Sequence, residues 1–121
     1  MIRLLIVEDQ PAVQKGLHMR LAVEPDLSMI GEVSDCKAAL SLTKSLNPDV
    51  VLVDIDMLNM EGMAIVDALH KLCPQVPVII LSIHDDTLTR ACAKDAGATA
   101  FVAKSMPADT LLTAIRQVIH S

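Results

Sequence analysis

Five short aliphatic runs, each four or five residues long, are separated by longer stretches of mixed polarity. The runs are Leu4–Val7, Met29–Val33, Val50–Val53, Val78–Leu81 and Ala100–Ala103. Continuous apolar runs of this length are typical of strands that are buried on both faces, as in a parallel sheet. The pattern therefore predicts five buried strands.

The stretches between and after these runs carry apolar residues at helical spacing, every three or four positions. The sets are Val13, Leu17 and Leu21; Ala39, Leu42 and Leu46; Ile65, Leu69 and Leu72; Leu88, Cys92 and Ala96; and Leu111, Ile115, Val118 and Ile119. Pro11 and Pro107 suit helix starts, Ser34-Asp35 suits a cap, and Gly97 suits a left-handed helix end.

Five alternating strands and helices predict an α/β fold, a doubly wound five-stranded parallel sheet with helices on both faces. The strand order 2-1-3-4-5 is taken from the common five-stranded form of this architecture.

The composition fits one domain and excludes several classes of protein. The chain has 121 residues, 52% of them hydrophobic, and 15 acidic against 10 basic residues for a net charge of −5. This balance disfavours a broad nucleic-acid surface, and a single aromatic residue, Phe101, leaves no platform for base stacking. No apolar run approaches the ~20 residues of a membrane span. Three cysteines without CxxC spacing favour free thiols, so we expect a cytoplasmic protein.

Polar residues follow four of the five predicted strands directly. They are Glu8 and Asp9, Asp54 and Asp56, Ser82, and Lys104. Ligands of open α/β sheets bind beyond the carboxyl ends of the strands, where the strand order reverses. We expect these side chains to share one cleft between the first and third strands. All-oxygen carboxylate ligands suit a hard divalent cation such as Mg²⁺.

A carboxylate beside such a cation, a lysine and a hydroxyl is equipped to attack a phosphoryl group and hold it as an aspartyl phosphate. An ionised carboxylate is already a nucleophile, so it needs no separate general base. Taken singly, each residue has a plainer explanation: Asp9 or Ser82 as a helix cap, Asp54 as a turn residue and Lys104 as a solvated loop residue. Their joint occurrence at one edge of the sheet favours the phosphoryl site.

Five segments, taken in order, resemble the receiver domain of two-component response regulators, which has the CheY-like fold. The segments are Ile6–Asp9, Pro48–Asp54, Met57–Gly62, Val78–Ser82 and Ala96–Lys104. Asp9-Gln10-Pro11 and Lys104-Ser105-Met106-Pro107 further resemble the NarL/FixJ subgroup, in which a LuxR-type helix-turn-helix output domain follows the receiver. We therefore expect residues 1–121 to be a single receiver domain that does not itself bind nucleic acid. The resemblance favours a C-terminal DNA-binding domain outside these residues, and the alternative is a single-domain receiver.

The resemblance also implies roles for the clustered residues. Asp54 is the expected phosphoacceptor, with the phosphohistidine of a sensor histidine kinase as donor. Mg²⁺ or Mn²⁺ is expected on Asp9, on Asp54, on Glu8 through water, and on the backbone carbonyl of Asp56. Lys104 and Ser82 are expected to bind the phosphoryl group. Phe101 is expected to turn into the space that Ser82 vacates.

Some positions depart from the usual receiver pattern or add to it. Met57-Leu58 stands where Met-Pro is common, so we expect a changed loop shape without loss of function. A cis bond before Ser105 is not expected, because it would cost ~2.5–4 kcal/mol before a non-proline residue. The side chain of Asp56 faces the phosphoryl group in one hypothesis, changing the lifetime of the phosphorylated form; in the other it supplies only its carbonyl. His84 is a second candidate modulator, against a solvated loop histidine.

Several alternatives stay open from the sequence. Met19, Val23 and Leu112 are candidates for a homodimer contact, against a place at the edge of the core. A receiver that acts without phosphorylation, as a protein-interaction module, is the main alternative function. A flavodoxin would need a phosphate-binding loop and aromatic residues that the chain lacks. A phosphatase with the Asp54-x-Asp56 pair would carry that pair after its first strand and would need a substrate cap.

Overall fold

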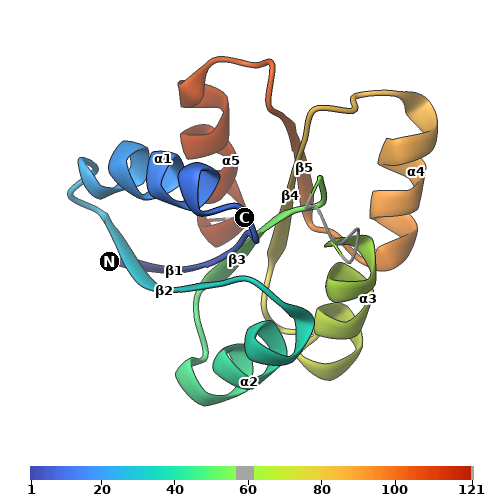
Figure 1. Cartoon of the computed structure of the whole chain (residues 1–121), viewed down its shortest axis with the longest axis horizontal. Coiled ribbons are helices and arrows are strands. Elements are labelled where there is room, and N and C mark those ends of the chain that lie inside the picture. The colour runs from blue at the N-terminus through green and yellow to red at the C-terminus, as the bar shows by residue number, and fades with distance from the viewer. Residues whose placement is uncertain (57–61, 121) are drawn as a thin grey trace.

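The computed structural model describes residues 1–56 and 62–120, which form alternating strands and helices (Figure 1). The elements are β1 (Ile2–Val7), α1 (Pro11–Ala22), β2 (Leu27–Val33), α2 (Cys36–Leu46), β3 (Val50–Asp54), α3 (Gly62–Leu72), β4 (Val78–Ser82), α4 (Thr87–Ala96), β5 (Ala100–Ala103) and α5 (Ala108–His120). All five strands and five helices expected from the sequence are present. Met57 and Leu58, the residues of the loop with the expected change of shape, lie outside the described residues.

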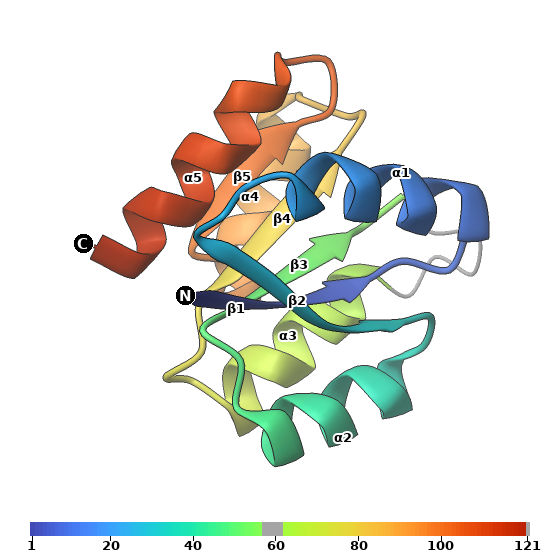
Figure 2. The same ribbon diagram turned by 90° about the vertical axis from the view of Figure 1, so that its left-hand side faces the viewer.

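The five strands form one parallel sheet in the order β2-β1-β3-β4-β5, which confirms the predicted topology. All strands point the same way, so their carboxyl ends meet at one edge. The order reverses between β1 and β3, and this is the position where α/β sheets of this kind bind ligands. Figure 2 shows α1 and α5 together on one face of the sheet, with α2 and α3 on the other.

Alternation along each strand sends side chains into two separate cores, because successive strand residues point to opposite faces. In β3, Val51 and Val53 join the core beneath α2, α3 and α4, while Val50 and Leu52 join the core beneath α1 and α5. All four are fully buried. This two-sided burial explains why the strand sequences are continuously aliphatic rather than alternating.

Helix ends follow the local chemistry that the sequence indicated. Asp35 caps α2, and its Oδ1 accepts the Ala38 N–H at 2.8 Å. Gly97 ends α4 with φ of 100°, a left-handed conformation that other residues adopt only with strain. Asp86 caps α4, so Ser82 is free of that role. Gln10, and not Asp9, stands at the N-cap position of α1, and its side chain makes no capping hydrogen bond.

Gly62 begins α3 at a point where the helix runs against the backbone after β3. A Cβ placed on it would overlap Ile55 Cα, which is backbone and has no freedom to give way. The close approach fixes where the chain after Asp54 meets α3.

Within the described ranges no peptide bond is cis, as expected for Ser105, and none of the helices is long and apolar enough to cross a membrane.

Candidate functional site

Asp54 and Lys104 meet at the carboxyl edge of the sheet, although 50 positions separate them in sequence. Asp54 is the last residue of β3, and its side chain has no exposed surface. Lys104 follows β5 directly, and its backbone N–H donates to the Ser82 carbonyl at 2.8 Å. The Lys104 ammonium donates to Asp54 Oδ2 in a close ion pair. The predicted nucleophile and the predicted cation are therefore in contact.

Asp56 turns its side chain into the same cluster. Its Oδ1 accepts the Ser82 hydroxyl at 2.9 Å, and its Oδ2 accepts the Ile83 N–H at 2.6 Å. Lys104 Nζ lies 3.4 Å from the same Oδ2. The backbone N–H of Asp56 donates to Asp54 Oδ1 at 2.9 Å. Asp56 therefore contributes more than its backbone, and the hypothesis that its carboxylate faces the site gains direct geometric support.

Glu8 supplies a third carboxylate from the end of β1. Its side chain is fully buried, and its Oε2 has no hydrogen-bond partner among the described residues. Burial, together with the neighbouring Asp54 carboxylate, raises the pKa of Glu8 to about 8. The folded chain therefore favours the protonated form of Glu8, because its ionisation would add buried negative charge beside Asp54 that Lys104 alone does not neutralise.

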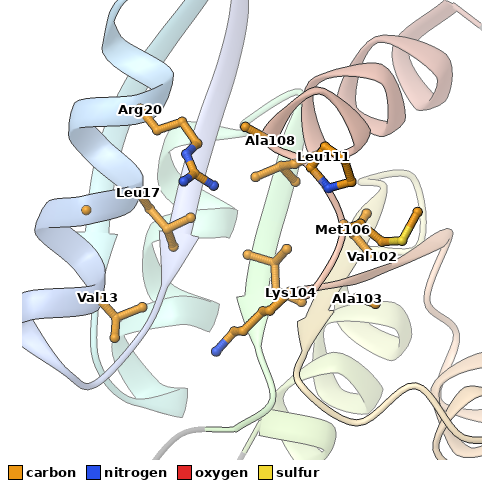
Figure 3. A pocket seen from close by; sticks show the side chains of 12 residues that line it. Val13, Leu17, Arg20, Val102, Ala103, Lys104, Met106, Ala108 and Leu111 are labelled. Carbon is orange, nitrogen blue, oxygen red and sulfur yellow. The ribbon is translucent and has the colours of Figure 1, made fainter.

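Lys104 lies between the carboxylates of Asp54 and Asp56 and an apolar cavity. Burial alone would lower its pKa, but the contacts with Asp54 and Asp56 outweigh burial and raise the pKa above its ordinary value. Its side chain lines a cavity of about 340 Å³ between α1, β5 and α5. Figure 3 shows the Lys104 ammonium pointing away from Ala108 and Leu111, which line the same cavity. Lys104 therefore stays charged and is aimed at the carboxylates.

The remaining predicted residues lie around this cluster with different contacts. Ser82 is buried, and its Oγ also accepts the His84 N–H at 2.9 Å. His84 therefore contributes its backbone, and its side chain is exposed. Phe101 is partly buried against the core beneath α4, with the Arg90 guanidinium carbon 4.6 Å from its ring centroid. Asp9 directly follows Glu8 in the loop between β1 and α1.

Sequence reasoning missed two groups at this edge. The Ile83 N–H is a backbone donor, so no side-chain pattern could have marked it. Arg90 contacts Phe101 across α4 and β5, and pairs with Asp85 in the loop before α4. A basic residue on an exposed helix face has many plainer explanations, and only the packing of α4 on β5 reveals this contact.

The cluster fits a hard cation by chemistry, although no ready-made metal site is present. Its donors are carboxylate oxygens, the ligands that Mg²⁺ prefers, and the orphaned Glu8 Oε2 is an acceptor in need of a positive partner. Among the described residues, no group of three or more His, Cys, Asp or Glu side chains is arranged to hold a metal ion. Asp54 is instead paired with Lys104. Cation binding would therefore require these side chains to rearrange.

Comparisons with known proteins show the family to which the chain belongs. Residues 4–116 match the family described as "Response regulator receiver domain". The chain is 33% identical over 117 residues to the transcriptional regulatory protein DegU of Brevibacillus brevis, covering 97% of this chain and 50% of that protein. It is 29% identical over 116 residues to the nitrate/nitrite response regulator NarL of Escherichia coli, covering 94% and 53%. The chain thus spans about half the length of these curated relatives.

Solved structures share the fold. The signal receiver domain of the putative response regulator NarL from Mycobacterium tuberculosis superposes with a TM-score of 0.89 at 27% identity, covering 99% of this chain and 97% of that chain. The response regulator domain of Thermotoga maritima CheB gives a TM-score of 0.89 at 26% identity, covering 100% and 98%. The expected resemblance, including the subgroup, is confirmed.

Proposed function

Because the chain belongs to the response regulator receiver domain family, we propose that it is a phosphoacceptor switch in which Asp54 carries the phosphoryl group. The observation that carries the proposal is the buried Asp54 carboxylate, paired with Lys104 at the edge of the sheet where β1, β3 and β5 end. The phosphohistidine of a sensor histidine kinase is the donor. The receiver family is not one of classical enzymes, and the phosphoryl chemistry is part of our proposal.

In the transfer step, an Asp54 oxygen forms a bond to phosphorus while the phosphorus–nitrogen bond of the donor breaks. The electron pair of that bond goes to the imidazole nitrogen of the kinase histidine. Asp54 is positioned for attack by the hydrogen bond from the Asp56 N–H and by the Lys104 ammonium. The ammonium also stabilises the charge that develops on the phosphoryl oxygens, because a fixed cation in a poorly solvated site is worth more than in water.

We propose that Glu8, Asp9, Asp54 and the carbonyl of Asp56 hold Mg²⁺ or Mn²⁺ during this step. The cation would neutralise charge on the transferring phosphoryl group. The buried and unpaired Glu8 Oε2, with the raised pKa of that carboxyl, supports the assignment, because a cation would relieve both. Ser82 then donates its hydroxyl to a phosphoryl oxygen, and Phe101 follows by changing its packing between β5 and α4.

We propose transcription regulation as the output, in the cytoplasm, through a helix-turn-helix domain outside these residues. The support is that the curated relatives are regulators whose length is about twice that matched here.

A homodimer is a further proposal. Met19 on α1 and Val23 directly after it are 63% and 74% exposed and supply apolar surface for the dimer. Leu112 packs at the edge of the core, as the plainer explanation expects. Sedimentation with and without phosphorylation tests the dimer.

The central test is incubation with acetyl phosphate and Mg²⁺, followed by intact mass measurement. We expect a single phosphoryl adduct on the wild-type chain and none on Asp54→Ala. The matched control is Asp85→Asn, which removes an exposed carboxylate from the loop after β4 and should keep the adduct. Wild-type protein that folds but never gains the adduct would favour the alternative, a receiver that acts by protein contact alone.

A further inference from the structure

Asp56 holds both hydrogen-bond donors that the end of β4 presents to the site. The Ser82 hydroxyl donates to Oδ1 and the Ile83 N–H donates to Oδ2, at 2.9 and 2.6 Å. The contact is bidentate, with one donor for each carboxylate oxygen of Asp56. The Asp56 side chain is only 13% exposed, and its contact with the Ser82 hydroxyl is partly buried, whereas its contact with the Ile83 N–H lies at the surface.

Each of these donors carries a single proton. A hydroxyl that donates to Asp56 has no proton left for a phosphoryl oxygen, and the same holds for the backbone amide. One lone pair of Ser82 Oγ is also engaged, because it accepts the His84 N–H at 2.9 Å. Ser82 and Ile83 therefore serve either Asp56 or a phosphoryl group, never both through the same proton.

The third contact of Asp56 is with the site's cation. Lys104 Nζ lies 3.4 Å from Asp56 Oδ2 while it donates to Asp54. Asp56 therefore draws on the hydroxyl, the amide and the ammonium, the same kinds of donor that a phosphoryl oxygen seeks. A phosphoryl group on Asp54 would add negative charge beside the Asp56 carboxylate, and like charges in a poorly solvated site repel strongly.

Resting on the function proposed above, we infer that the Asp56 carboxylate is an internal substitute for the phosphoryl group. In the unphosphorylated protein it occupies the donors of Ser82 and Ile83 and holds the end of β4 in place. Phosphorylation must displace it before those donors can close on the phosphoryl oxygens. Asp56 is thus a positioning residue that sets the threshold of the switch.

The first experiment examines the resting protein alone. In Asp56→Ala we expect the Ile83 amide resonance to move upfield and its hydrogen exchange to accelerate, without any ligand, because its acceptor is gone. The variant Asp67→Asn, which removes a half-exposed carboxylate from α3, should leave that resonance unchanged. An unmoved Ile83 amide in Asp56→Ala, in a chain whose circular dichroism is unaltered, would overturn the inference.

The second experiment measures the affinity for Mg²⁺ with beryllofluoride, a phosphoryl mimic that attaches to a carboxylate. We expect Asp56→Asn to bind it about tenfold more tightly than wild type, equivalent to about 1.4 kcal/mol. Asparagine keeps the shape of the side chain but can accept only one of the two donors. Asp85→Asn, which also removes one negative charge near the site, should bind within about twofold of wild type.

A double-mutant cycle separates release of the donors from loss of charge. In a Ser82→Ala background one of the two donors is already absent, so Asp56→Asn should improve binding by much less than tenfold. An equal improvement in both backgrounds would mean that charge alone acts, and would overturn the inference. The proposed function fails separately, if the wild-type chain never takes a phosphoryl group from acetyl phosphate on Asp54.

Discussion

Replacing Glu8 by glutamine tests how much the buried carboxylate cluster costs the folded protein. Glu8 has no exposed surface, and its Oε2 lacks a hydrogen-bond partner among the described residues. Its pKa rises from 4.5 to about 8, first through burial and then through Asp54. Between these two values the folded chain keeps a proton that the unfolded chain has lost. The free energy of unfolding of wild type therefore falls as pH rises through this window.

The size of the effect follows from linkage. Each unit between the unfolded and folded pKa is worth about 1.4 kcal/mol, so the ceiling for Glu8 is about 5 kcal/mol above pH 8. Water penetration and side-chain adjustment reduce such penalties, and we expect about 2–3 kcal/mol. Glu8→Gln cannot ionise and is free of this penalty. The variant should gain stability relative to wild type as pH rises from about 5 to about 8.5.

Urea unfolding followed by far-ultraviolet circular dichroism suits this test, since the chain has no Trp or Tyr for fluorescence. Both proteins are unfolded in the presence of a chelator across the pH range. The difference at each pH matters, because any fixed cost of burying the amide is the same throughout. A stability gap that stays constant from pH 5 to pH 8.5 would refute the reasoning. Saturating Mg²⁺ should flatten the wild-type curve if the proposed cation site is correct.

Two further predictions concern packing around the site. Gly62→Ala should lower the free energy of unfolding by about 2 kcal/mol or more, because its Cβ overlaps Ile55 Cα and the backbone must shift; an unchanged urea midpoint would contradict the close approach. Arg90→Gln should cost about 0.5–1 kcal/mol through loss of the cation over Phe101. Arg90→Lys should retain part of it, and equal losses in both Arg90 variants would show that charge over the ring contributes nothing.

Much of the fold is predictable because burial and chain chemistry agree. The β3 sequence is apolar on both faces, and only a strand covered by helices on each side accommodates that. Asp35 and Gly97 mark helix ends by mechanisms that act within a few residues, so their roles follow from sequence alone. The strand order is not local information, and it came from the known form of the architecture.

The candidate site is predictable only in part. That Asp54 and Lys104 share an edge follows from the parallel sheet, since both stand directly after strands. The two hydrogen bonds that Asp56 accepts from Ser82 and Ile83 depend on the path of two loops. The spacing of apolar and polar residues along the chain does not predict that path. That Glu8 Oε2 has no hydrogen-bond partner in the part of the chain that the structure describes is likewise a property of the packed interior.

The pairing of Asp54 with Lys104 across 50 positions has a consequence for biosynthesis. A growing polypeptide exposes β1 and β3, with their carboxylates, well before the ribosome has added the ammonium that balances them. Burying several acidic side chains together is unfavourable without a positive charge beside them. The charges of the nascent sheet are therefore balanced only when the last strand docks and brings Lys104. Completion of the proposed phosphoryl site and completion of folding would thereby be one event, and a chain released before β5 would complete neither.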